Sequence, residues 1–307
     1  MAGLRVEWSQ SGHFDSFEVY RSSVSTSISE LTTPLASNIK TMFYLDTTVV
    51  QGSKYYYRIK VIRGSESIFS AEYEAIASAG DEFWNSVELI IFAEAATYPS
   101  SVFKDRSNYA KTISTYGLPK IVAPTGLTSS YDGGWIEFPS ETPSRVDTTI
   151  SSLGNQDFTY EQFVFLQTKP TQQNAIFSIG DYGAANSLAI SVDSSGNIWL
   201  EGMFSYTYIG VIVGSTPIPL NTRCHICLMR KSGVFFLFLN GVRLGFSEYY
   251  VGYAIPGGQF SLGNYSGQTH PSSAYKGYAS SIRLTKGIAR YPQEGFLPPT
   301  TKFPTSL

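Results

Sequence analysis

The chain has 307 residues, which is long enough for two domains and a sizeable hydrophobic core. Its 22 Lys and Arg against 24 Asp and Glu give a formal net charge of -2 without a basic stripe, which excludes a nucleic-acid partner held by phosphate neutralisation. Aromatic residues make up 15% of the sequence, as do charged residues, and together with 27 Gly they are typical of an all-β chain of short strands and tight turns.

The N-terminus runs directly into a strand-like pattern, so we expect no signal peptide and synthesis in a cytosol. No apolar stretch reaches membrane-spanning length, which predicts that no segment inserts into a membrane. Cys224 and Cys227 are three residues apart on an expected strand, so their side chains point to opposite faces and are expected as buried thiols. A C-x-x-C pair can also be half of a zinc site, but no second pair exists, and we predict neither a metal nor another cofactor.

Residues 1–80 predict a small β-sandwich in which short strand-like segments are separated by polar stretches. The segments are LRVEW, FEVYRSS, MFYLDTTVVQGSKYYYRIKVIRG and SAEYEAIAS. The first three resemble a fibronectin type III domain. The resemblance implies that Trp8 is the core tryptophan and Tyr55 the tyrosine of the conserved corner, although Gln51 stands where that family has proline. Domains of this family act as spacers or docking modules.

Residues 81–307 predict a second, larger all-β domain. At its centre, the stretch Arg223–Gly245 predicts a three-stranded meander, because Ser232-Gly233 and Asn240-Gly241 are turn pairs between apolar runs. The run Val234–Leu239 has no polar alternation, so we expect both of its faces to be covered, as in the middle of a two-sheet sandwich. A short helical turn is expected around Lys286–Arg290, and the proline-rich tail is expected to lie extended along the surface.

Four stretches of this domain resemble a concanavalin A-like jelly roll of the laminin-G type, in the form found in bacteriophage tail and virion proteins. They are SSYDGGWIEFP, DFTYEQFVF, CHICLMRKSGVFFLFLNGVRLG and the closing YKGYASSIRLTKGIARYPQEGFLPPTTKFP. The closing stretch is the most specific of the four. The sequence departs from the family at Thr222-Arg223, where a Trp is usual, at Asn240, where the turn has Asp, and at Ser280-Ser281, where the family has an acidic pair. The last two remove carboxylates on which a calcium site would depend, and no metal-binding residue is assigned.

An enzyme on this fold would need acidic residues arranged for catalysis. Laminarinase-type hydrolases place three on one strand with the spacing E-x-D-x-x-E, and this sequence has no such triplet. Glu137, Glu141, Asp157 and Glu161 are isolated and are expected as solvated turn or strand-end carboxylates. Gly-x-Ser-x-Gly is absent, and His225 is expected in the core or at its rim. We therefore predict no enzymatic activity.

Carbohydrate binding is the alternative that the aromatic loops favour, because sugars stack their apolar faces on aromatic rings and bond to amides and hydroxyls. The competing interpretation is that the same tyrosines pack on sheet edges or against a neighbouring subunit. The candidate glycan-binding residues are Tyr206, Tyr208, Tyr249, Tyr250, Tyr253, Asn264 and Tyr265, with Gln268 and His270 nearby.

Through the resemblance, the sequence predicts a structural protein of the bacteriophage virion, as a tail, fibre or decoration component. Its expected location is the virion, and its expected partners are other virion proteins, copies of itself in a homo-oligomer, and host cell-surface glycan. The alternatives are a purely structural assembly protein and, less favoured, a glycoside hydrolase.

Overall fold

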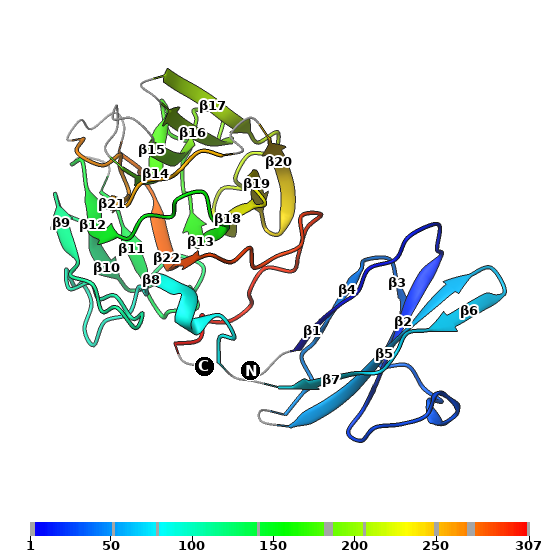
Figure 1. The fold of residues 1–307 in the computed structure, drawn as a ribbon. Coiled ribbons are helices and arrows are strands. Elements are labelled where there is room, and N and C mark those ends of the chain that lie inside the picture. The colour runs from blue at the N-terminus through cyan, green and yellow to red at the C-terminus, as the bar shows by residue number, and fades with distance from the viewer. Residues whose placement is uncertain are drawn as a thin grey trace. The chain divides into compact units, whose positions relative to one another are not determined.

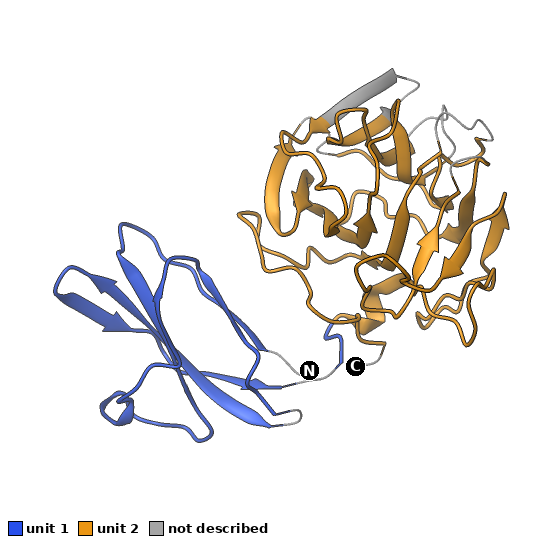
Figure 2. Ribbon diagram, turned by 180° about the vertical axis from the view of Figure 1, so that it is seen from behind, with its two compact units in different colours: residues 1–82, 306–307 blue, residues 83–305 orange. Residues whose placement is uncertain are grey.

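A computed structural model describes residues 4–50, 53–77, 80–139, 142–180, 187–204, 207–248, 252–268 and 274–305, with the backbone alone over 203–204 and 207–211. Among these residues the only helical elements are two single 3-10 turns, η1 (Ile28–Glu30) and η2 (Trp84–Ser86). The chain divides into two compact units, one within Met1–Glu82 and one within Phe83–Thr305 (Figures 1 and 2). The all-β prediction is confirmed.

The first unit consists of two small antiparallel sheets. One pairs β1 (Leu4–Glu7) with β4 (Phe43–Asp46). The other has the order β3-β2-β5-β6, with β7 also on β5, and its strands are β2 (Ser16–Ser22), β3 (Ala36–Ile39), β5 (Lys54–Arg63), β6 (Glu66–Phe69) and β7 (Tyr73–Ile76).

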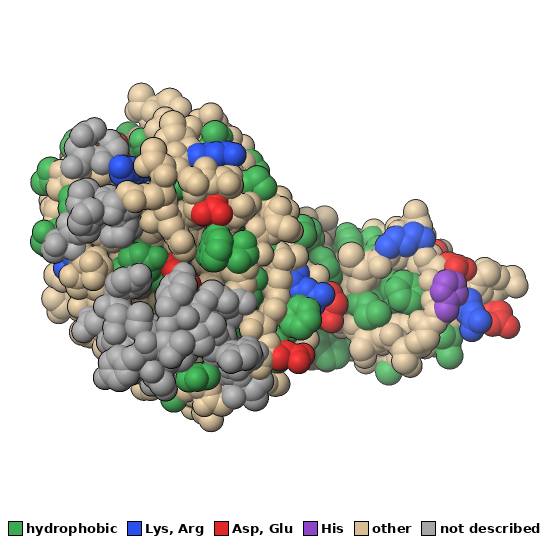
Figure 3. Space-filling view, turned by 90° about the horizontal axis from the view of Figure 1, so that it is seen from above, with side chains coloured by type: hydrophobic (Ala, Val, Ile, Leu, Met, Phe, Trp, Pro, Cys, Tyr) green, Lys and Arg blue, Asp and Glu red, His purple; other side chains and the backbone are tan. Residues whose placement is uncertain are grey.

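Both residues that the sequence analysis singled out in this unit adjoin its core. The Trp8 ring packs edge-on against buried Phe17 with a centroid distance of 5.2 Å, and the Val50 N–H donates to the Tyr55 hydroxyl over 2.9 Å. A histidine lies among acidic and basic side chains at one end of the unit (Figure 3), where His13 Nε2 is 3.4 Å from Asp15 Oδ1.

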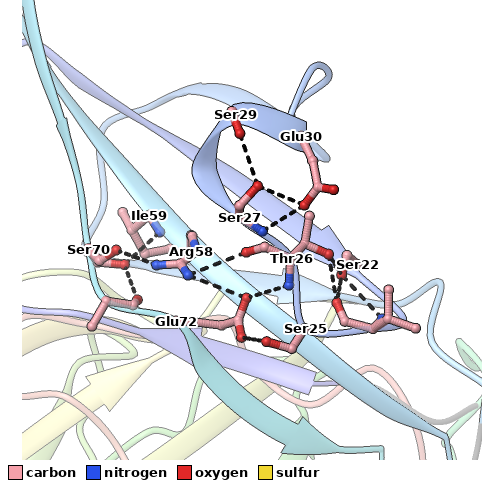
Figure 4. Close-up of polar contacts among 12 residues, drawn as sticks. Ser22, Ser25, Thr26, Ser27, Ser29, Glu30, Arg58, Ile59, Ser70 and Glu72 are labelled. Atoms are coloured by element: carbon pink, nitrogen blue, oxygen red, sulfur yellow. Dashed lines mark hydrogen bonds and ion pairs between the residues drawn. The ribbon is translucent and has the colours of Figure 1, made fainter.

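The serine-rich loop between β2 and β3 is fixed by polar contacts (Figure 4). Glu72 accepts the Ser25 hydroxyl over 2.6 Å and the Thr26 N–H over 3.1 Å, and its carboxylate lies 3.5 Å from Arg58 Nη2. Glu30 closes a capping box by accepting the Ser27 N–H. These contacts tie the loop to β5 and to the segment before β7, so it is an ordered part of the unit.

The second unit is a sandwich of two antiparallel sheets (Figure 1). The eight-stranded sheet has the order β10-β11-β22-β13-β18-β19-β20, with β8 also on β22. Its strands are β8 (Val87–Ile91), β10 (Lys120–Val122), β11 (Trp135–Glu137), β13 (Phe158–Phe165), β18 (Arg223–Lys231), β19 (Val234–Leu239), β20 (Val242–Ser247) and β22 (Tyr278–Lys286).

The seven-stranded sheet has the order β17-β16-β15-β14-β21-β12-β9. Its strands are β9 (Ser114–Tyr116), β12 (Arg145–Ile150), β14 (Asn174–Ile179), β15 (Ser187–Val192), β16 (Ile198–Phe204), β17 (Thr207–Val213) and β21 (Gly258–Leu262). The core lies between the sheets, where Tyr160 of β13 stacks on Phe177 of β14 with a centroid distance of 3.7 Å.

The predicted meander is confirmed as β18-β19-β20. Both turn pairs have positive φ at both positions, 51° and 86° at Ser232-Gly233 and 51° and 76° at Asn240-Gly241, as a type I′ turn requires. At Gly241 a side chain is also excluded by space, because a Cβ would lie 1.8 Å from the Phe296 carbonyl oxygen.

Both faces of β19 are covered, as predicted, but the second cover is not another sheet. Phe235 and Leu237 enter the sandwich core, whereas Phe236 and Phe238 face outward. On that outer side they pack with Phe296 of the closing segment. The sheet is therefore covered on its outer face by the chain that follows β22.

The closing segment, which comes after β22, is held in place by hydrogen bonds and by packing. The prediction of a helical turn at Lys286–Arg290 is wrong, because the backbone there bonds to the loop before β13 and to β13 itself. The Gly287 N–H donates to the Asp157 carbonyl, and the Arg290 N–H donates to Thr159 Oγ1. The tail that follows contains no helix or regular strand up to residue 305, and it is anchored, since Phe303 is only 3% exposed in a cluster that includes Trp84 and Trp135.

Candidate functional site

The outer face of the seven-stranded sheet carries small and polar side chains beside one tryptophan. Strand alternation sends Leu200 of β16 into the core and turns Trp199 and Glu201 outward. The register places Ser191 of β15 opposite Trp199, and Ala189 opposite Glu201. These side chains therefore share one face.

Three of these residues join two from other parts of the chain in a group that we call the outer-face cluster: Gln173, Ser191, Trp199, Glu201 and Tyr265. The Gln173 amide donates to Ser191 Oγ over 2.7 Å and to Glu201 Oε2 over 3.2 Å, and the Tyr265 hydroxyl donates to Glu201 Oε1. Glu201 is 3% exposed, whereas Gln173 and Trp199 are half-buried. The buried Glu201 carboxylate thus holds the cluster together, and the Gln173 amide and the Trp199 indole are the groups that the cluster exposes.

The indole ring of Trp199 is held in one orientation. Its Nε1–H donates over 3.0 Å to Asp193 Oδ2 in the loop between β15 and β16, and Asp193 also accepts the backbone N–H groups of Ser195 and Asn197. Partial burial acts to raise the pKa of Asp193, but the hydrogen bonds from Trp199 and the loop backbone outweigh it and hold the pKa below the usual value. Val213 of β17, opposite Trp199 in the register, is 49% exposed. A fixed aromatic surface thus lies between an exposed valine and a bonded amide.

The structure places the sequence-predicted glycan residues in different settings. Tyr206, Tyr249 and Tyr250 lie outside the described residues, as does His270. The backbone of Tyr208 lies on β17 opposite Met203. For these positions ligand binding stays a prediction.

Tyr253, Asn264 and Tyr265 are described. Tyr265 belongs to the outer-face cluster, and Asn264, which is 0% exposed, accepts the Tyr265 N–H at its Oδ1 over 2.8 Å. Tyr253 lies apart from this pair: it packs against the sandwich core, and its carbonyl accepts Arg230 Nη1 over 2.7 Å. Asn264 and Tyr265 are neighbours in the chain, the fold places Tyr253 elsewhere, and the contact of all three with a ligand stays a prediction.

Trp199, Gln173 and Glu201 were missed by the sequence analysis. The available signal was the alternation in SLAISVDSSGNIWLEG, where Trp199 occupies an outward position between two core residues. An outward tryptophan on a sheet face is a stronger indication of a binding surface than tyrosines in loops, because the strand fixes its direction.

Glu161 forms a second polar group, on the outer face of the eight-stranded sheet. Its Oε1 accepts Arg283 Nε over 3.0 Å and Nη2 over 2.8 Å, and its Oε2 accepts the Tyr291 hydroxyl over 2.7 Å and lies 3.1 Å from His225 Nε2. Burial acts to raise the pKa of Glu161, but the charge of Arg283 and the hydrogen bond with His225 outweigh it and hold the pKa well below its usual range.

The expectation that Glu161 is a solvated, isolated carboxylate is therefore wrong. It is 0% exposed in the middle of β13, and His225, 1% exposed, is a core residue as predicted. Phe303 covers the group, with the Arg283 guanidinium carbon 4.0 Å from its ring centroid. With its carboxylate oxygens occupied and the group shielded from solvent, this group anchors the tail and offers no place for a substrate.

The residues that the structure describes contain no group of three or more His, Cys, Asp and Glu that could hold a metal ion. Across the same part of the chain, no helix is long and apolar enough to cross a membrane. Cys224 and Cys227 are free and buried, and each lies in a different hydrophobic cluster, as predicted from their spacing.

Residues 140–288 match the family model of the concanavalin A-like lectin/glucanases superfamily, of the type named Laminin_G_3. The second unit contains a concanavalin A-like jelly-roll domain. This confirms the predicted jelly roll and its laminin-G type. A comparison with curated proteins finds no match.

Several solved structures are similar to this jelly-roll chain. A heptameric SAP-like pentraxin from Limulus polyphemus is 17% identical, over 48% of this chain and 73% of that chain, with a TM-score of 0.38. Domain 4 of AbnA, a GH43 extracellular arabinanase from Geobacillus stearothermophilus in complex with arabinotriose, is 14% identical over 66% and 93%, with a TM-score of 0.46. The binding domain of botulinum neurotoxin DC, in complex with rat synaptotagmin II, is 12% identical over 66% and 48%, with a TM-score of 0.47. The chain thus spans about half the length of that neurotoxin domain.

Proposed function

We propose that the jelly-roll domain binds carbohydrate at the outer-face cluster and carries out no chemical step. The observation that carries this proposal is the half-buried Trp199 ring, which is fixed by Asp193 and flanked by the Gln173 amide. A sugar ring stacks an apolar face on such an indole, while the amide and nearby hydroxyls bond to the sugar hydroxyls.

The environment of Glu201 supports binding rather than hydrolysis. A glycosidase uses two carboxyl groups that flank the scissile bond, about 5 to 9 Å apart. Glu201 is 3% exposed, and its two oxygens accept hydrogen bonds from the Tyr265 hydroxyl and the Gln173 amide. It is placed to position these two donors and not to attack a sugar.

The test is to measure binding to a glycan array and to host cells for Trp199→Ala and Trp199→Phe. We expect the alanine variant to lose at least about tenfold in affinity and the phenylalanine variant, which keeps a ring, to lose less. Phe246→Ala is the matched control, because Phe246 is an aromatic residue 52% exposed on β20 of the other sheet. Unchanged binding by Trp199→Ala, with the fold intact, would rule out this site.

Four of the tyrosines predicted from the sequence give an independent part of the same experiment. Changing Tyr206, Tyr208, Tyr249 and Tyr250 to Ala together tests that prediction separately from the outer-face cluster. Loss of binding in this variant alone would move the site to these tyrosines and away from Trp199.

We further infer that the chain is a structural component of a tailed-bacteriophage virion, in which the first unit is a fibronectin type III-like spacer. The closing RLTKGIARY stretch supports the first part by its resemblance to phage relatives. The Tyr55 hydroxyl, bonded to the backbone five residues upstream, supports the second. Mass spectrometry and antibody labelling of purified particles test the inference, and absence of the chain from intact particles would refute it.

A purely structural role is the second candidate function. The strands β6 and β7 of the first unit favour it, because Ile68, Tyr73 and Ile76 are 71%, 69% and 57% exposed and are suited to contact another subunit. If particles bind host cells equally well with and without Trp199→Ala while these residues are buried in the particle, this candidate replaces the first.

A further inference from the structure

A cavity of about 550 Å³ lies in the jelly-roll domain beside the segment that follows β8. Its walls include Phe92, Glu94, Thr97, Lys104 and Arg106, and small side chains fill the rest of the lining. The cavity adjoins the eight-stranded sheet through β8, whereas the outer-face cluster lies on the seven-stranded sheet. It is therefore a separate site within the same domain.

One carboxylate in the cavity wall holds two cations in place. Glu94 Oε1 accepts Arg106 Nη2 over 2.7 Å, and Glu94 Oε2 accepts Nζ of Lys302 from the tail. The Lys302 ammonium also lies 4.2 Å from the centroid of the Phe92 ring. Partial burial acts to raise the pKa of Glu94, but the charges of Lys302 and Arg106 outweigh it and keep the pKa below its usual value. Glu94 is thus ionised at neutral pH and neutralises only one of the two cations.

Lys104 is the second cation that lines the cavity, beside Arg106. It is exposed and forms no hydrogen bond or ion pair with any residue of the described chain. Arg106 uses one N–H donor on Glu94, which leaves further donors of its planar guanidinium for a ligand. Lys104 and Arg106 line this concave surface against one lining carboxylate, Glu94, which also pairs with Lys302. Such a surface attracts anions, because low-dielectric walls focus the field.

We propose that this cavity binds the acidic group of a monosaccharide-sized ligand, a carboxylate or a phosphate, through Lys104 and Arg106. A volume of about 550 Å³ falls in the range of small-molecule sites. The hydroxyls of Thr97 and Ser100 in the same lining supply partners for the neutral part of the ligand. Arg and Lys recognise carboxylate and phosphate through charge-assisted hydrogen bonds, which are the strongest polar contacts available to such a site. This proposal does not depend on the outer-face cluster.

The test is calorimetric titration of the full chain at low ionic strength with glucuronate, glucose 6-phosphate and glucose. We expect at least one acid to bind and glucose not to bind, and the affinity to fall as salt is added. The two acids decide between carboxylate and phosphate. Equal binding of glucose, or no binding of either acid, would overturn the proposal.

Variants locate the binding. Lys104→Gln and Arg106→Gln should each weaken acid binding by about tenfold or more, since each removes a charged donor. Lys104 is exposed and forms no hydrogen bond or ion pair with a described residue, so we expect its variant to keep the fold even if Arg106→Gln disturbs Glu94. Lys169→Gln is the control, because it removes the same charge from an exposed position between β13 and β14. If acid binding survives both cavity variants and is lost in Trp199→Ala, the ligand lies at the outer-face cluster, which refutes this cavity while supporting the proposed function.

Discussion

Replacing Glu161 by Gln should destabilise the jelly-roll domain strongly, although it changes one buried carboxylate into an amide of the same shape. Arg283 is 5% exposed and lies against both the carboxylate and the Phe303 ring. In the variant Arg283 loses the negative charge of this carboxylate, and the amide can accept with only one of its two former oxygens.

The expected magnitude follows from the burial of the pair. Removing one partner of a buried, hydrogen-bonded ion pair costs about 3 to 5 kcal/mol. Glu94→Gln is the matched control, because Glu94 also holds two cations but its side chain is 30% exposed. For these partly exposed ion pairs the expected cost is about 0 to 1 kcal/mol. The two variants make the same chemical change and differ chiefly in burial.

Urea unfolding followed by tryptophan fluorescence measures both variants, because Trp84, Trp135 and Trp199 lie in the jelly-roll domain and only Trp8 lies in the first unit. We expect the midpoint of the jelly-roll transition to fall for Glu161→Gln and the melting temperature to drop by roughly 10 °C. Equal midpoints for Glu161→Gln and Glu94→Gln would refute the reasoning, since burial would then not determine the cost.

Three further outcomes follow from the same structure. The pKa of the buried Glu161 carboxylate is depressed, so its stabilising contribution is present above the usual value of 4.5 and is lost as the pH falls below it. Wild type should therefore lose more stability on acidification than Glu161→Gln, as measured by urea titrations between neutral and acidic pH. Gly241→Ala should cost about 3 kcal/mol, because a Cβ there would lie 1.8 Å from the Phe296 carbonyl oxygen, whereas Gly287→Ala, with positive φ but open space, should cost about 1 kcal/mol. Phe303→Ala should cost about 3 to 5 kcal/mol and expose the tail to limited proteolysis, while Leu297→Ala, at a position 50% exposed in the same tail, should do neither.

Features determined by residues close together in the sequence could be predicted. The type I′ turn at Asn240-Gly241 needs only two residues that tolerate positive φ, and the structure has both. The opposite faces of Cys224 and Cys227 follow from the period of a strand. The jelly roll itself was predictable because its strand segments occur in a recognisable order, which the match over residues 140–288 supports.

Features that join distant residues could not be predicted. The partners of Glu161 lie 64, 122 and 130 residues further along the chain, at His225, Arg283 and Tyr291. Nothing in the local sequence distinguishes this carboxylate from a solvated one. The outer-face cluster has the same difficulty, since Gln173 and Tyr265 lie 28 and 64 residues from the Glu201 that holds them.

The run Val234–Leu239 shows how a correct local prediction left the location of the binding face open. Its lack of alternation required a cover on each side, and the cover on the outer side is Phe296, stacked on Tyr291 with a centroid distance of 3.8 Å. Because the closing segment occupies the outer face of the eight-stranded sheet there, that part of the face is closed to a ligand. The seven-stranded sheet instead carries small and polar outward residues with a half-buried tryptophan, and this difference between the two sheets is what places the proposed sugar site on the latter.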